Sequence, residues 1–227
     1  MDHATHEHHA HQHRPHEHHE HDLASRSMAV SATLHCLSGC AIGEIAGLMI
    51  GTALGLANGW TIALSVGLAF LFGYSLSTLP LVRSGLAVGA ALGVVLAADT
   101  LSIATMEVVD NAVMALIPGA MGAGLVDVTF WIGMPIALAV AFVAAYPVNR
   151  HLLARGKGHA LTHAFHGAPA EPTGYRRFIP DVATSTVVAA IAAFLLGGLV
   201  VSAADTLGTE TSEGGGHAAP TPVSARA

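Results

Sequence analysis

The chain has 227 residues, of which 52% are hydrophobic and 11% charged, and its formal net charge at pH 7 is −6. This composition argues against a water-soluble globular domain and is typical of a membrane protein. Five apolar runs are long enough to cross a hydrocarbon core of about 30 Å, which takes roughly 20 helical residues. Because the runs are continuous instead of alternating, a β-barrel is excluded. We therefore predict an all-α integral membrane bundle of about five transmembrane helices, near residues 28–57, 60–79, 85–117, 130–148 and 182–203.

Residues 1–27 precede the first apolar run and contain ten histidines. The segment lacks the basic cluster of a signal peptide, so we expect the first run to be retained as a helix. Its few apolar side chains predict a disordered tail. Imidazole is a common ligand for zinc, copper and nickel, and closely spaced histidines offer many chelating combinations. The tail is therefore a candidate metal-binding segment, or a solvated spacer with incidental metal affinity; the histidines singled out are His8, His9, His18, His19 and His21.

The first apolar run carries glycine at every fourth position, namely Gly39, Gly43, Gly47, Gly51 and Gly55. Small residues let two membrane helices approach closely. The third run has a similar stripe at its start, formed by Gly85, Gly89, Gly93 and then Ala97. We predict that these two helices pack together through their small residues, and we assign the glycines no chemistry.

Beside this stripe, "LHCLSGCAIGE" (residues 34–44) places Cys36, Cys40 and Glu44 at four-residue spacing, on one face of a helix. A disulfide is not expected, because Cβ atoms four residues apart lie about 5–6 Å apart and a bridge needs about 3.8 Å. The same spacing lets two ligands converge on one metal ion. The alternative is a pair of inert buried thiols. His35, next to the pair, joins the candidate ligands.

The third run, "AADTLSIATMEVVDNAVM", contains Asp99, Glu107 and Asp110. Each ionisable group at the centre of a membrane helix costs about 2.5–3.5 kcal/mol, so we expect these to have a function. Asp99, Met106 and Asp110 fall within about 80° of one another around the helix. For Asp110, capping of the helix or contact with the membrane surface is an alternative. Sulfur ligands favour Cu(I) and also suit zinc, whereas carboxylates suit harder ions or protons, so the sequence fits a metal path, a proton relay or both.

The basic residues near the apolar runs predict the orientation. They precede the first run, follow the second and follow the fourth, which puts all of them on one side of the membrane; they are Arg14, Arg26, Arg83, Arg150, Arg155, Lys157, Arg176 and Arg177. We therefore expect a cytoplasmic N-terminus and an external C-terminus. The transmembrane domain is expected over 28–206, with a cytoplasmic loop at 149–180 that holds His159, His163 and His166, and a disordered tail at 207–227.

Four sequence blocks carry a family resemblance: "LHCLSGCAIGE", "AADTLSIATMEVVDNAVM", "AAYPVNR" and "ARGKGHA". They resemble the conserved blocks of a bacterial membrane-protein family catalogued as domain of unknown function 4396, over roughly residues 31–159. The resemblance implies the bacterial plasma (inner) membrane but brings no established activity. Labels of some relatives point to copper proteins.

The leading functional hypothesis is a membrane protein that binds or transports a transition metal ion, copper first and zinc or nickel next. The alternatives are a membrane oxidoreductase, in which Cys36 and Cys40 are redox thiols and the carboxyls relay protons, and an accessory subunit without chemistry of its own. We leave open whether the protein is an enzyme and favour a role without catalysis. We expect the lipid bilayer and a metal ion as partners, no nucleic acid, and leave a homo-oligomer open. The candidate metal ligands within the membrane are His35, Cys36, Cys40, Glu44, Asp99, Met106, Glu107 and Asp110.

Overall fold

The computed structural model describes residues 15–155, 174–179 and 183–213, without the side chains of 15–24, 175 and 209–213. Over these residues the chain is helical and contains no strand. The helices are α1 (Pro15–Ala53), α2 (Asn58–Arg83), α3 (Val88–Leu116), α4 (Val128–Ala154) and α6 (Thr184–Glu213), with short 3₁₀ helices η1 (Ala120–Gly122) and η2 (Gly174–Phe178). Five segments are long and apolar enough to cross a membrane: Ser25–Ala53, Asn58–Arg83, Val88–Leu116, Val128–Ala154 and Thr184–Gly208. The prediction of an all-α, multi-pass membrane bundle is confirmed.

Two glycines set the first two tight turns of the bundle. Gly55, with a φ of 65°, follows α1, and the Leu56 N–H donates to the Gly51 carbonyl at 2.9 Å. Gly85, with a φ of 118°, follows α2 in the same way, and the Leu86 N–H donates to the Leu81 carbonyl at 3.1 Å. Both are helix ends in which a left-handed glycine lets the chain turn back and satisfy free carbonyls. Hence α1 ends four residues before the predicted boundary at 57, and α3 begins at Val88 instead of at 85.

The other helix boundaries extend further than the apolar runs. Helix α1 begins at Pro15, in the segment where composition predicts a disordered tail, although its membrane-spanning part begins at Ser25. Helix α4 continues past residue 148 to Ala154, and α6 continues past residue 207 to Glu213. A helix can continue through polar residues once it has left the apolar layer of the membrane. Hydropathy alone therefore underestimates the lengths of α1, α4 and α6.

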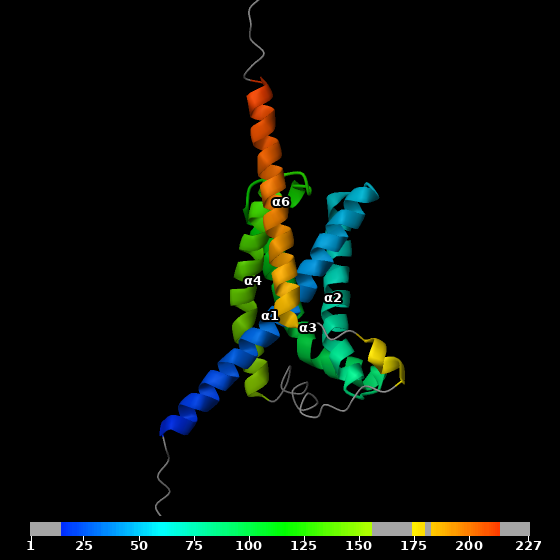
Figure 1. Ribbon diagram of the computed structural model, residues 1–227, viewed down its shortest axis with the longest axis vertical. Helices are drawn as coiled ribbons and strands as arrows, with labels where there is room; N and C mark the ends of the chain where they lie inside the picture. The colour runs from blue at the N-terminus through cyan, green and yellow to red at the C-terminus, as the bar shows by residue number, and fades with distance from the viewer. Residues whose placement is uncertain (1–14, 156–173, 180–182, 214–227) are drawn as a thin grey trace, which may run out of the picture.

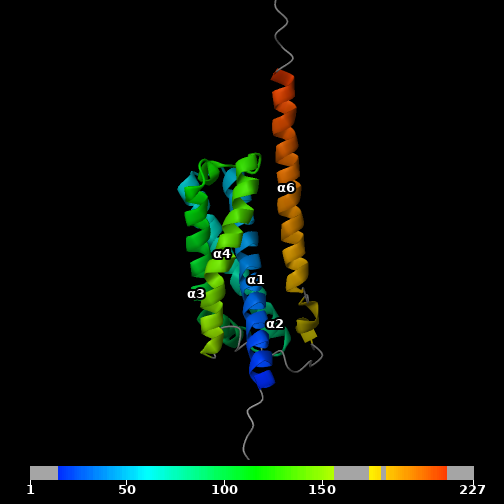
Figure 2. The same cartoon turned by 90° about the vertical axis from the view of Figure 1, so that its left-hand side faces the viewer.

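Helix α1 is the central helix of the bundle and packs against α2, α3, α4 and α6. Helices α2, α3 and α4 run beside it, and α1 crosses them at a marked tilt (Figure 1). Helix α6 stands at the edge of the bundle (Figure 2). It is anchored on α4 by the Trp131 ring, which lies over Gly198 and 5.5 Å from the Phe194 ring centroid.

The glycine stripe of α1 packs against α2, and the predicted pairing with α3 is wrong. A Cβ added at Gly39, Gly43 or Gly47 would overlap the backbone of Gly73, Ala69 and Ser65 of α2, respectively. By contrast, a Cβ at Gly89 or Gly93 of α3 would meet no atom within 4 Å. The α1–α2 connection has only a few residues, so a tight antiparallel pair forms between sequence neighbours. The stripe therefore orients the Cys36 face of α1 toward α3.

We expect Gly43→Val to destabilise the protein by at least ~2 kcal/mol, because the new side chain would overlap the Ala69 backbone and force α1 and α2 apart. Thermal unfolding in detergent measures this as a lower Tm. The matched control is Gly93→Val on α3, which meets open space and should leave Tm nearly unchanged. A larger loss for Gly93→Val than for Gly43→Val would contradict the α1–α2 pairing.

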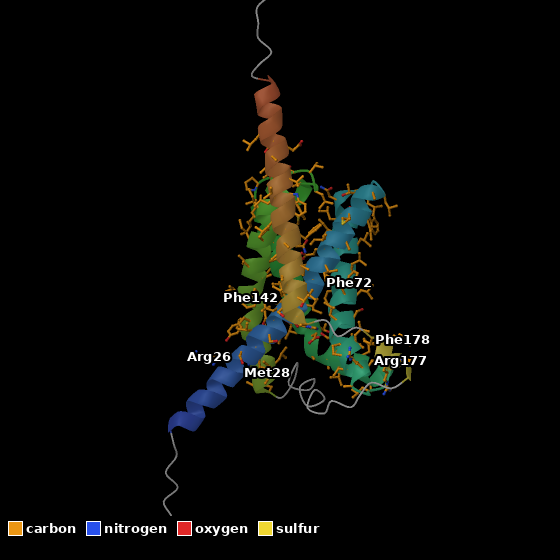
Figure 3. All side chains as sticks on the ribbon, viewed as in Figure 1. Arg26, Met28, Phe72, Phe142, Arg177 and Phe178 are labelled. Carbon is orange, nitrogen blue, oxygen red and sulfur yellow. The ribbon has the colours of Figure 1, made fainter. Side chains whose placement is uncertain are left out.

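The two ends of the bundle differ in charge. The arginines of the described residues lie at the end where α1 begins and α2 and α4 finish, and Arg26 and Arg177 mark two sides of it (Figure 3). There Arg83 donates through Nη1 to the Ile179 carbonyl at 2.8 Å, which ties α2 to the segment after η2. We call this the arginine end. The opposite end, formed by the α1–α2 turn and by the α3–α4 connection with η1, is called the η1 end.

Candidate functional site

A seam of polar and sulfur-containing side chains runs between α1 and α3, which are parallel. On α1, Cys36, Cys40 and Glu44 occupy successive turns of one face, and all three are buried. Each lies opposite a group of α3. Cys36 lies near Asp99 and Ser102, Cys40 near Glu107, and Glu44 near Asp110. The seam therefore consists of three levels, each with one α1 group and at least one α3 group.

The carboxyl groups at the Cys40 and Glu44 levels are buried, and the side chains that approach them are acidic or thiol groups and not basic ones. Glu44, Glu107 and Asp110 are only 8%, 4% and 5% exposed. Both side-chain oxygens of Glu44, both of Glu107, and Oδ1 of Asp110 have no hydrogen-bond partner. Buried polar groups are normally hydrogen-bonded, and an exception needs an explanation such as a ligand, an ion or water. These carboxyls are the strongest indication of function among the described residues.

A cavity of about 400 Å³ connects the level of Glu44 and Asp110 to the η1 end. We call it the vestibule. Glu44 and Asp110 are at its buried floor, and the turn residues Gly55, Asn58 and Gly124 are at its mouth. Its wall includes the hydroxyl-bearing Thr61 and Ser65 of α2 and the Asn111 amide of α3. Because its mouth consists of connections between membrane-spanning helices, the vestibule opens at the membrane surface.

The seam is closed toward the arginine end. Thr33 of α1, one turn before Cys36, is fully buried and donates to the Ala29 carbonyl at 2.7 Å. It also accepts a bond of 3.0 Å from Nδ2 of buried Asn149 on α4. Ala32 and Ala145, which neighbour the pair along their helices, are also buried. The seam therefore connects to the vestibule at the η1 end, whereas the hydrogen-bonded Thr33 and Asn149 lie between it and the arginine end.

Three sulfur-containing side chains form the middle of the seam. Cys36, Cys40 and Met106 belong to one buried cluster, together with Ala69, Ile103, Ala141 and Ala145. Both cysteines are free thiols, in agreement with the helical geometry that disfavours a bridge between them. A buried, mainly apolar cluster with three sulfur-containing side chains is suited to a soft metal ion.

The remaining candidate residues lie away from the seam or outside the described side chains. His35 is half-buried on another side of α1, where its Nδ1 lies 3.2 Å from Oγ1 of Thr184 at the start of α6. His8 and His9 lie outside the described residues, and of His18, His19 and His21 only the helical backbone is described. The loop histidines His159, His163 and His166 also lie outside the described residues.

Within the described part of the chain, no three His, Cys, Asp or Glu side chains form a group that could hold a metal ion by themselves. Metal binding at the seam would therefore use pairs of such ligands, completed by methionine sulfur or by water. Sequence reasoning had not singled out the Thr33–Asn149 pair or the α2 wall of the vestibule. Ser102, three residues after Asp99 and thus on the same face of α3, could have been found from helical spacing.

Comparisons with curated proteins and with solved structures find no match to the chain. Helices α1 to α4, which form the seam and the vestibule, account for almost all of the segment that matches a known family, and α6 lies beyond it. This match spans residues 26–158, more than half of the chain, and confirms the resemblance carried by the sequence blocks: the chain belongs to the family described as Domain of unknown function (DUF4396).

Proposed function

We propose that the protein binds a transition metal ion, copper first, and passes it along the seam between α1 and α3. The observation that carries the proposal is the buried cluster in which the thiols of Cys36 and Cys40 and the thioether of Met106 lie together. Thiolate and thioether sulfur atoms select Cu(I) over harder ions, and Cu(I) is satisfied by few ligands. Zinc and nickel are the next candidates, because thiolate and imidazole also bind them.

Charge balance supports a cation as the cargo. Asp99 and Glu107 lie next to Cys36 and Cys40, so acidic side chains neighbour the thiols. Such an environment opposes an anionic substrate in an apolar membrane core and is offset by a bound cation. The buried carboxyls above the thiols extend the same preference toward the vestibule.

The proposed orientation places the arginine end in the cytoplasm of a bacterial cell, in the plasma membrane, following the preference of basic residues for that side. The histidine-rich N-terminal segment would then collect metal on the cytoplasmic side, and the vestibule would open outward.

Copper binding by a protein that lacks residues 2–22 tests the proposal. This deletion removes every histidine before His35 and ends before the membrane-spanning part of α1 begins at Ser25. We expect one tightly bound Cu(I) per chain in detergent, measured by competition with a chelator, and sulfur ligation in its X-ray absorption spectrum. A folded protein that binds no Cu(I), zinc or nickel would contradict the proposal. If Cys36 and Cys40 instead changed oxidation state during turnover, the oxidoreductase alternative would be right.

A further inference from the structure

We propose that the vestibule is a second cation site, distinct from the sulfur cluster, which takes a hydrated divalent cation between Glu44 and Asp110. The inference goes beyond copper binding at the thiols and does not depend on it. It rests on the buried carboxyl oxygens, the composition of the wall and the size of the cavity.

The carboxyl oxygens point to a ligand because, within the described residues, their side-chain partners are one another and the Cys40 thiol, with no basic group among them. Glu44 and Asp110 are each more than nine-tenths buried, line the vestibule, and have side-chain oxygens without a hydrogen-bond partner. Glu107 lies directly behind them, with both oxygens also without a partner. Among the described residues that line the cavity there is no lysine, arginine or histidine. Neighbouring buried acids oppose one another's ionisation, so a bound cation would stabilise the ionised form of Glu44 and Asp110 in a way that no basic residue of the cavity lining can.

The wall of the vestibule indicates which kind of cation it would take. Besides the two carboxyls, its polar side chains are the hydroxyls of Thr52, Thr61 and Ser65 and the amides of Asn58 and Asn111. Oxygen ligands of this kind suit hard divalent cations such as Mg²⁺ and Mn²⁺, and not the soft ion expected at the thiols. The sulfur atom of Met114 also lines the cavity and is a weak ligand for hard ions.

The size of the cavity favours an ion that keeps its water. A volume of about 400 Å³ is many times what a single water needs, so the cavity has room for an ion together with its waters. Magnesium-like ions give up water reluctantly and commonly bind through one or two carboxylates with several waters retained. One carboxylate from α1 and one from α3 provide this arrangement, and water bridges can reach the wall hydroxyls. Because only two protein carboxylates are needed, the site is compatible with the lack of a three-ligand group.

Electron paramagnetic resonance of Mn²⁺ tests the site in the protein that lacks residues 2–22 and carries Cys36→Ser and Cys40→Ser, so that neither the tail nor the thiols contribute. We expect one bound Mn²⁺ per chain, displaced by Mg²⁺. Glu44→Gln and Asp110→Asn should each weaken binding by at least ~10-fold. The control is Asp127→Asn, since Asp127 caps α4 at the same end of the bundle but does not line the cavity. Its pKa is lowered by the Thr129 backbone N–H, so its charge is present in the experiment.

The inference is overturned if a protein that elutes and melts as a folded species binds no Mn²⁺. It is also overturned if Glu44→Gln and Asp110→Asn leave binding unchanged, or if Asp127→Asn causes an equal loss. A carboxyl infrared band that titrates with pH in a protein that binds no Mn²⁺ would assign the cluster to protons instead, and would also overturn it. Mn²⁺ binding at the vestibule in a protein whose intact thiols bind no copper would support this site and contradict the proposed function. The two proposals can therefore fail separately.

Discussion

Replacing Cys36 or Cys40 by serine will weaken Cu(I) binding by the protein that lacks residues 2–22 by more than ~100-fold, beyond the effect usual for a residue that only supports a ligand. Serine keeps the size of the side chain but exchanges a soft sulfur for a hard oxygen. Both cysteines are 1% exposed and lie in one cluster with Met106, and the buried residues of this cluster that the structure describes include no fourth sulfur to replace the lost one. A chelator competition in detergent measures the change.

The control for this experiment is Ser38→Ala on the same helix. Ser38 lies between the two cysteines in sequence, and its hydroxyl donates to the Leu34 carbonyl of α1 itself at 2.7 Å. Its loss removes a polar atom from the helix without changing the sulfur cluster, so Cu(I) affinity should stay the same. We also expect Asp99→Asn, which removes a charge next to Cys36, to abolish tight binding. Unchanged affinity in all three site variants would reduce the seam to a packing contact between helices.

The sequence was most informative where helical periodicity alone decides which residues share a face. The spacing of Cys36, Cys40 and Glu44 predicts one face of α1, and the structure places all three on the side that faces α3. The buried carboxyls of α3 follow from the same rule, because an ionisable residue in an apolar run faces the interior of the bundle. Periodicity gives the angle of a side chain around its helix and nothing about its neighbour.

The partner of the glycine stripe shows this limit. Gly39 and Gly43 require a close helix, but a stripe on α3 and the small residues Gly73 and Ala69 of α2 both satisfy that requirement. The short α1–α2 turn, closed by Gly55, decides in favour of α2. The vestibule was even less predictable, because it is assembled from α1, α2, α3 and the α3–α4 connection. No single stretch of sequence contains it.

A cationic, membrane-impermeant thiol reagent will distinguish the two ends of the seam in intact cells. Two proteins with a single cysteine are compared: one carries Cys36→Ala, Cys40→Ala and Ser65→Cys, and the other carries only Cys40→Ala and keeps Cys36. Ser65 lines the vestibule, which opens at the membrane surface. Cys36 is 1% exposed and separated from the arginine end by the Thr33–Asn149 hydrogen bond. We expect rapid labelling from outside in the first protein and none in the second until it is denatured.

The charge of the vestibule adds a second readout to the same experiment. Because Glu44 and Asp110 are at its floor, a cationic reagent should react in the Ser65→Cys protein roughly 10-fold faster than an anionic reagent of the same size. Adding Glu44→Gln should reduce that ratio, since one of the carboxyls that attracts the cation is then gone. Labelling of the Ser65→Cys protein only from the cytoplasmic side would show that the orientation is reversed. Equal labelling of the two proteins would show that the seam is open along its whole length, which would remove the physical basis for a selective cation path.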